Sequence, residues 1–190
     1  MISERKSTRR LVLLSMLSAC GLVLFVFESF LPILPWFRPG LGNVATLIAL
    51  MMFGFSDALK VTILRVVLGA LVLGRLFTPV FIFALAGGLA SVVVMAIVFR
   101  YAKKVFGPVG ISVLGAVAHN MVQLFIAYLL FIKSAEIFIF IPVFLGAAVV
   151  TGTIVGIVAH MVLEKTKGRL GFEPVWQTNF TAENAEGAEA

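Results

Sequence analysis

The sequence predicts an all-α membrane protein, a bundle of six transmembrane helices with both termini in the cytoplasm. Three observations favour this fold class. Of the 190 residues 61% are apolar, only 13% are charged, and the apolar residues form six runs separated by short polar stretches. A soluble domain is typically about 45–50% apolar and about 25% charged. A water-soluble domain of this length could not bury so much apolar surface, so part of the solvent must be lipid. These properties argue against a soluble enzyme, a nucleic-acid-binding domain and a disordered protein.

The six apolar runs differ in length. A spanning helix needs about 20 residues, within a usual range of about 17–25. The first, fourth, fifth and sixth runs meet this requirement, whereas the second and third are slightly short. Those two are either short spans or a re-entrant pair buried against the other helices, and both arrangements return the chain to the same side. The expected spans are residues 11–34, 41–55, 58–73, 79–99, 109–132 and 137–163.

The distribution of Lys and Arg predicts the orientation. Eleven of them lie at the N-terminus, near the second-to-third connection, in the fourth-to-fifth loop and after the sixth run, against three in the opposite loops. This bias places the larger group, and both termini, in the cytoplasm of a multi-pass protein of the cell membrane. The net charge of +6 therefore reflects topology and not nucleic-acid binding. The expected parts are a basic N-terminus (1–10), a membrane domain (11–163) and a polar, disordered tail (164–190).

The single cysteine, Cys20, excludes an intrachain disulfide framework and a CxxC metal site. The stretch Leu17-Ser18-Ala19-Cys20 fits a lipoprotein cleavage box, in which case Cys20 is lipidated and the first span is lost. Against this, the residues after Cys20 continue the apolar run, whereas a mature lipoprotein normally turns polar there. The alternative is that Cys20 is a small residue in helix packing.

A few polar residues lie within the apolar spans. An ionisable side chain costs at least ~2.5–3.5 kcal/mol at the bilayer centre, so it usually faces the bundle interior. On the predicted topology these residues gather in the outer half of the membrane, and helix N-termini on the same side favour an anion. We therefore expect an outward-facing site for a small anionic or zwitterionic solute. The candidate solute-binding residues are Glu28, Arg38, Asn43, Arg65, Arg75, His119, Asn120 and Gln123.

Most of these residues also have a structural interpretation. Glu28 and Arg65 are alternatively an intramembrane ion pair. His119 and Gln123 are alternatively interhelical hydrogen-bonding residues, and the loop arginines are alternatively interface anchors. Small residues, among them Gly87-Gly88 and the Gly152-xxx-Gly156 pair, are expected to allow close helix packing.

The sequence lacks the common catalytic motifs. It has no GxxxxGK[ST], HExxH or GxSxG motif and no metal-spaced Cys/His cluster, so no metal or cofactor is expected. Asp57 is the only aspartate, whereas magnesium-dependent diphosphate chemistry needs clustered carboxylates. An autonomous membrane enzyme is therefore not expected. Six spans without an ATPase motif indicate a subunit that relies on partners.

Several motifs together resemble a bacterial family called "heptaprenyl diphosphate synthase component I", also called the Gx transporter family. They are Arg38-Pro39-Gly40-Leu41-Gly42-Asn43, Phe53-Gly54-Phe55, Leu64 to Gly69, Ala86-Gly87-Gly88, Leu114 to Gln123 and Glu28 to Pro32, and the resemblance covers about residues 10–165.

The two family names imply different functions. The transporter name implies likeness to the six-helix S components of energy-coupling factor (ECF) transporters, which bind solutes and work with a coupling protein and two cytoplasmic ATPases. In that class small residues on the first helix dock the partner, and Ser15 and Ala19 are the matching candidates. The synthase name implies a non-catalytic partner of a soluble prenyl diphosphate synthase. The residues favour the S component, with the accessory role as the alternative and a structural or assembly factor as the third possibility.

Overall fold

The computed structural model describes residues 2–30, 39–102 and 105–166, with side chains from residue 7 onward. Within these ranges every regular element is helical. Two short turns, one π-helical and one 3-10, join the last two long helices. The elements are α1 (Ile2–Glu28), α2 (Asn43–Phe53), α3 (Phe55–Val72), α4 (Pro79–Tyr101), α5 (Pro108–Ala127), η1 (Tyr128–Ile132), η2 (Ala135–Phe140) and α6 (Ile141–Thr166).

The helix boundaries follow from glycine and proline. Gly54 separates α2 from α3 with a φ of 92°, a conformation that a residue with a Cβ rarely adopts. Pro79 and Pro108 lie at the start of α4 and α5, where a missing N–H breaks no helical hydrogen bond. Lys133 ends η1 in the left-handed conformation. The long apolar sequence is thereby divided into separate helices.

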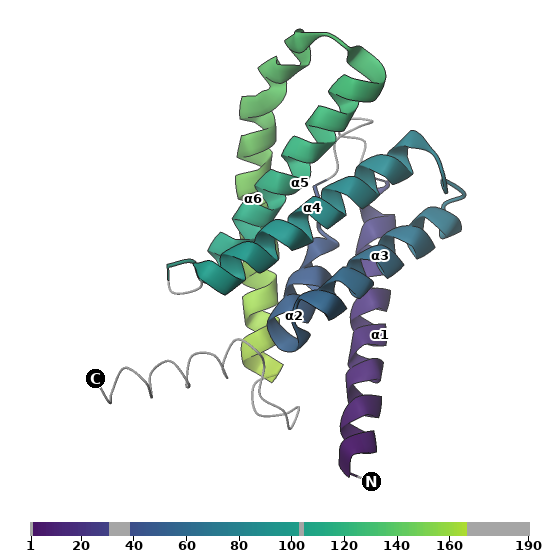
Figure 1. The fold of residues 1–190 in the computed structure, drawn as a ribbon, viewed down its shortest axis with the longest axis vertical. Coiled ribbons are helices and arrows are strands. Elements are labelled where there is room, and N and C mark those ends of the chain that lie inside the picture. The colour runs from purple at the N-terminus through teal and green to yellow at the C-terminus, as the bar shows by residue number, and fades with distance from the viewer. Residues whose placement is uncertain (1, 31–38, 103–104, 167–190) are drawn as a thin grey trace.

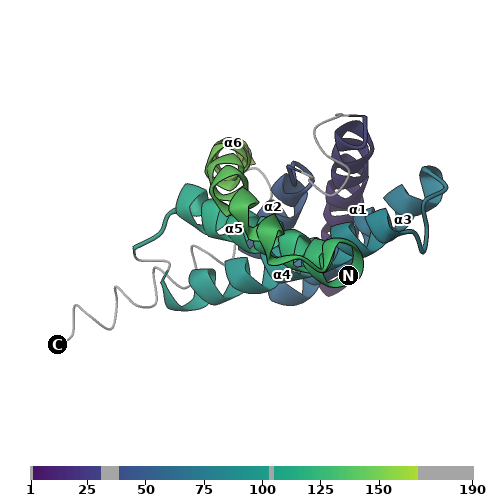
Figure 2. The ribbon, with the colours of Figure 1, turned by 90° about the horizontal axis from the view of Figure 1, so that it is seen from above.

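The short helix α2 lies at the centre of the bundle. Nine of its eleven residues are buried, and it contacts α1, α3, α4 and α6. Seen from above, α2 lies between α1 and α6, while α3, α4 and α5 run along the other side (Figure 2). The α5–α6 hairpin extends beyond the other helices at one end of the molecule (Figure 1). A helix that is apolar on every side is stable only when it is surrounded in this way.

Four helical segments in the described chain are long and apolar enough to cross a membrane: Ser7–Glu28, Pro79–Tyr101, Pro108–Ile132 and Ala135–Thr166. At 1.5 Å per residue, α2 is only about 16 Å long, against a hydrocarbon core of about 30 Å. Helix α3 is about 27 Å long on the same basis and carries three ionisable residues, Asp57, Lys60 and Arg65. These two helices are the second and third predicted segments, and α2 has the burial expected of an internal segment.

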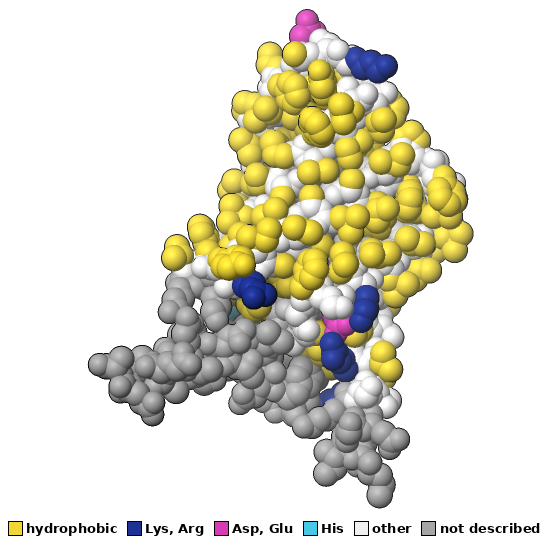
Figure 3. Space-filling view, in the orientation of Figure 1, with side chains coloured by type: hydrophobic (Ala, Val, Ile, Leu, Met, Phe, Trp, Pro, Cys, Tyr) yellow, Lys and Arg dark blue, Asp and Glu magenta, His cyan; other side chains and the backbone are white. Residues whose placement is uncertain are grey.

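The surface matches a membrane environment. In Figure 3, hydrophobic side chains cover the middle of the molecule, and charged side chains lie above and below this band. The exposed large residues include Val23 of α1, Ile97 of α4, Phe125 of α5 and Val150 of α6. An apolar surface of this extent is unstable against water, whereas lipid chains solvate it. The chain is therefore a multi-pass helical membrane protein.

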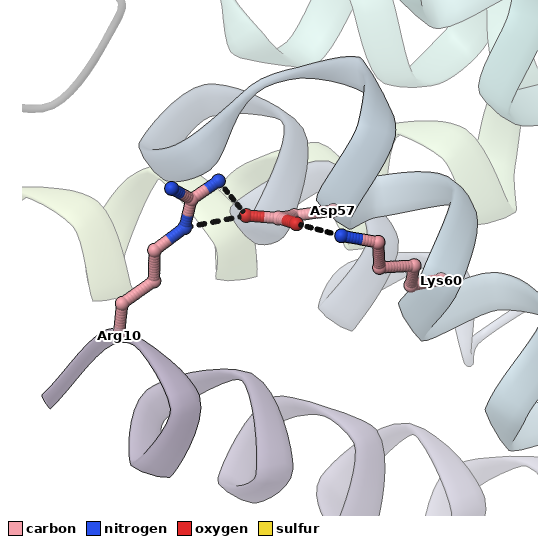
Figure 4. Close-up of polar contacts among 3 residues, drawn as sticks. All are labelled: Arg10, Asp57 and Lys60. Atoms are coloured by element: carbon pink, nitrogen blue, oxygen red, sulfur yellow. Dashed lines mark hydrogen bonds and ion pairs between the residues drawn. The ribbon is translucent and has the colours of Figure 1, made fainter. Parts of the chain in front are cut away.

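One end of the bundle is closed by a charged clasp formed by Arg10, Asp57 and Lys60 (Figure 4). Arg10 of α1 donates hydrogen bonds to Asp57 Oδ2 from Nε, at 2.7 Å, and from Nη2, and Lys60 Nζ lies 3.0 Å from Oδ1. The Asp57 side chain is only 2% exposed, while its two cationic partners are largely exposed. Arg10 also lies over the ring of Phe53, 5.9 Å from its centroid. The clasp therefore fixes α1 against the α2–α3 turn.

The same contacts set the protonation of Asp57. Burial by itself raises the pKa of this carboxyl, but the hydrogen bonds and charges of Arg10 and Lys60 outweigh burial and hold the pKa below its usual value. A lowered folded-state pKa contributes stability that is present above the unfolded-state pKa of about 3.9 and is lost as the pH falls through the folded value.

We expect Asp57→Asn to lower the free energy of unfolding by about 1–3 kcal/mol at neutral pH, because three charge-assisted hydrogen bonds, two from Arg10 and one from Lys60, are weakened. The difference from wild type should be constant above about pH 4 and should shrink below it, where the wild-type carboxyl is protonated. Thermal unfolding in detergent across this pH range measures the difference. Glu136→Gln, at an exposed acidic residue, is the control, and an undiminished difference at low pH would contradict the role of the ionised clasp.

Close packing of α5 on α6 depends on two glycines, as the sequence predicts. A Cβ on Gly152 would lie 2.6 Å from Val113 Cα, and one on Gly156 would lie 2.5 Å from Val109 Cα. Both contacts are with backbone atoms, so they cannot be relieved by a side-chain rotation. The two helix axes must separate if either glycine gains a side chain.

Gly156→Ala is therefore expected to destabilise the protein by about 1–3 kcal/mol, the usual effect of overpacking. Gly146→Ala, on the same helix but with nothing within 4 Å of the added carbon, is the matched control and should be neutral or slightly stabilising. The measurement is the unfolding temperature of both variants in the same detergent. Equal temperatures would show that α6 can move away from α5 freely.

Candidate functional site

A buried arginine on α3 is the centre of the candidate site. Arg65 is 2% exposed, and its Nη2 donates a hydrogen bond of 2.5 Å to Asn43 Oδ1 at the start of α2. The carboxylate of Glu28, at the end of α1, interacts with it electrostatically. The Nε–H of Arg65 has no hydrogen-bond partner among the described residues. Three helices therefore hold a guanidinium that retains a free donor.

Two glycines make room for this arginine, and a third, on α4, lies in ordinary contact with it. A Cβ on Gly42 would lie 2.1 Å from Arg65 Nη1, and one on Gly21 of α1 would lie 3.1 Å from Arg65 Cδ. On α4, a Cβ on Gly88 would lie 3.8 Å from Nη2. A side chain at position 42 would therefore force the guanidinium to move, because the guanidinium lies directly against the backbone at the N-terminus of α2.

The same helix N-terminus binds the carboxylate of Glu28. The backbone N–H of Leu41, in the turn before α2, donates a hydrogen bond to Glu28 Oε1. Glu28 is 4% exposed and Asn43 is also 4% exposed, so this contact is shielded from solvent. A helix N-terminus carries a partial positive charge and favours an anion, and Arg65 adds a full positive charge at the same place.

A second polar group, around His119 of α5, adjoins the first. His119 Nε2 and Gln123 Nε2 form a hydrogen bond of 2.9 Å, and both residues are buried. The imidazole lies between two glycines, because a Cβ on Gly87 would be 3.0 Å from it and one on Gly40 would be 3.7 Å from it. Gly40 also lies beside Asn43, since its added Cβ would be 2.9 Å from Asn43 Nδ2. The turn before α2 therefore joins the arginine and histidine groups into one polar site.

The other predicted residues lie elsewhere. Asn120 is buried but faces α6, where its Nδ2 donates a 3.1 Å hydrogen bond to the carbonyl of Phe144, and its Oδ1 has no partner in the described chain. Arg75 is exposed in the turn between α3 and α4. Arg38 lies outside the described residues. Ser15 and Ala19 are exposed on α1, where a partner could reach them.

Sequence reasoning identified the polar side chains but not the glycines that shape their site. Gly42 and the Gly87-Gly88 pair were assigned only to motifs and to helix packing. The structure shows that Gly87 adjoins His119 and Gly88 adjoins Thr62 and Arg65. The position of Gly21 near the site could have been inferred from its spacing, because it lies seven residues before Glu28 and therefore on the same face of α1.

The chemistry of the site is that of anion binding. It offers a guanidinium, a helix N-terminus, an amide and an imidazole, with one internal carboxylate. Among the described residues, no group of three or more His, Cys, Asp or Glu side chains is placed to hold a metal ion. Asp57, the only aspartate, lies in the clasp with Arg10 and Lys60, so it is committed to ion pairs.

The fold and the site define a helical membrane protein with a buried polar centre. The family model described as heptaprenyl diphosphate synthase component I matches residues 17–162, which include every residue of the arginine and histidine groups. The protein belongs to this family. Comparisons with curated proteins and with solved structures find no significant match.

The pairing of Glu28 with Arg65 can be tested by a double-mutant cycle. Arg65→Met alone should destabilise the protein by about 3–5 kcal/mol, because it leaves a buried carboxylate without its counter-charge. The double variant Arg65→Met/Glu28→Gln should recover most of this loss, since neither charge is then buried alone. Thermal unfolding in detergent gives the coupling. Additive effects of the two substitutions would show that the charges act independently.

Proposed function

We propose that the protein is a membrane-embedded solute-binding subunit of an uptake transporter of the ECF type. Its solute is small and anionic or zwitterionic, and it is captured from the outer side of the cell membrane. The observation that carries the proposal is the placement of Arg65 against the N-terminus of α2, inside a bundle whose buried residues are mainly apolar. Packing alone does not require a buried cation, and such residues in membrane proteins mark binding sites or transport pathways.

The rest of the structure is consistent with a subunit that depends on partners. The sequence has no ATP-binding motif. Along α1, an exposed face carries Val12, Ser15, Met16, Ala19 and Val23. The small residues on this face permit close approach of another helix. We propose that an ECF coupling protein docks there, with cytoplasmic ATPases bound to it.

The family description supports a second candidate, a non-catalytic membrane component of a heptaprenyl or polyprenyl diphosphate synthase. A diphosphate is an anion, so the positively charged groups of the site are compatible with this role as well. Catalysis by this chain is disfavoured, because its only aspartate is engaged in the clasp and magnesium-dependent diphosphate chemistry needs several carboxylates. Any contribution to the synthase would therefore be accessory, with the catalytic residues on a soluble partner.

Native mass spectrometry of the gently purified protein tests the two candidates together. We expect a bound small anion and a co-purified coupling protein with its ATPases. Arg65→Lys should reduce solute retention about tenfold or more, because lysine keeps the charge but cannot reproduce the planar donor pattern of arginine. Arg75→Ala tests the exposed loop arginine in the same way.

The control is Arg100→Ala, at an exposed arginine at the far end of α4. It should retain the solute like the wild type. Co-purification of a soluble prenyltransferase, with increased synthase activity on adding this protein and no retained solute, would reject the transport proposal in favour of the second candidate.

A further inference from the structure

We infer that Glu28 is a built-in competitor for the solute: its carboxylate occupies the anion site in the empty protein, and the carboxylate of an incoming solute displaces it. This inference rests on the proposed solute-binding function and specifies both the ligand group and how the site is controlled. The structure supports it in three steps.

First, the site holds a carboxylate already. Glu28 Oε1 accepts the backbone N–H of Leu41, and the carboxylate interacts electrostatically with Arg65. These are the two elements, a helix N-terminus and a guanidinium, that proteins use to bind carboxylate ligands. The geometry therefore fits a carboxylate group because it binds one from its own chain.

Second, the donors exceed what Glu28 uses. The Nε–H of Arg65 is buried and has no acceptor among the described residues. An unsatisfied buried donor is unfavourable, so an added acceptor at this position stabilises the site. Arginine presents its N–H groups as a planar fork that matches both oxygens of a carboxylate. A solute carboxylate can therefore engage a donor that Glu28 leaves open.

Third, Glu28 is the member of the pair that can move. It is the last residue of α1, next to the turn formed by Ser29 and Phe30, so its backbone lies at a helix end and not within a helix. Arg65 lies in the middle of α3 and is enclosed by Gly21, Gly42 and Gly88. Displacement therefore releases the end of α1 from Leu41 while the arginine stays in place. Solute binding and the position of the end of α1 become linked.

The experiment measures binding of propionate, a small carboxylate that resembles the end of a glutamate side chain, to the purified protein in detergent. Binding is followed by the rise in unfolding temperature and by isothermal calorimetry. Glu28→Gln should bind propionate about tenfold or more tightly than the wild type, because no internal carboxylate competes for the site. Glu28→Asp, whose shorter side chain retains the charge, should fall between the two and covers the case in which the glutamine variant does not fold.

Two further variants and one further probe, inorganic diphosphate, complete the design. Glu136→Gln removes an exposed acid and should bind like the wild type. Adding Arg65→Gln to Glu28→Gln should abolish the gain, which would assign the effect to this site. Weaker binding to Glu28→Gln than to the wild type would overturn the inference, since Glu28 would then contact the solute directly, and it would leave the proposed function standing.

Absence of propionate binding to every variant, or a clear preference for inorganic diphosphate, would also overturn the inference. The proposed function is judged separately, by the solute and the partners found in native mass spectrometry. A carboxylate solute that Glu28→Gln retains more strongly than the wild type would support both.

Discussion

The burial of one guanidinium constrains most of this bundle. A cation removed from water needs a counter-charge and hydrogen-bond acceptors, and each of these comes from a different helix. Glu28 supplies the charge from α1, and Asn43 supplies an oxygen from α2. The glycines around Arg65 then allow the backbones to approach it. Residues of α1, α2 and α4 therefore meet around a single side chain of α3.

Two separate charged groups hold the two ends of α1. At one end, the clasp of Arg10, Asp57 and Lys60 fixes α1 to the start of α3 with exposed cations around a buried acid. At the other end, Glu28 holds α1 to the turn before α2. The clasp is bordered by water and titrates with pH, whereas Glu28 is enclosed by the bundle. One end of α1 is thus held by ion pairs, and the other is the end that the proposed solute would reposition.

Much of this architecture could be predicted from the sequence, because long apolar runs indicate helices and the polar stretches between them indicate where the helices end. The burial of Glu28, Arg65 and His119 was also predictable, since ionisable groups in apolar runs avoid lipid. The glycines that adjoin these residues were not. Whether Gly42 adjoins an arginine or lipid depends on how helices approach one another, and a glycine carries no side chain to signal it. The separation of Arg75 from the buried polar residues could not be predicted either. A position in a loop does not show whether the side chain points toward the bundle or away from it.

The shortness of α2 has an electrical consequence. This helix is about 16 Å long, so it cannot reach both surfaces of a hydrocarbon core of about 30 Å, and Asn43 at its N-terminus is buried among the other helices. In the proposed orientation, an anion that reaches Arg65 from outside has crossed part of the transmembrane potential, which is worth about 2.3 kcal/mol per charge for every 100 mV across the full thickness. An inside-negative potential therefore opposes its binding. Under the proposed function, the occupancy of the site would depend on the membrane potential, and a solute that carries a compensating positive charge would avoid this penalty.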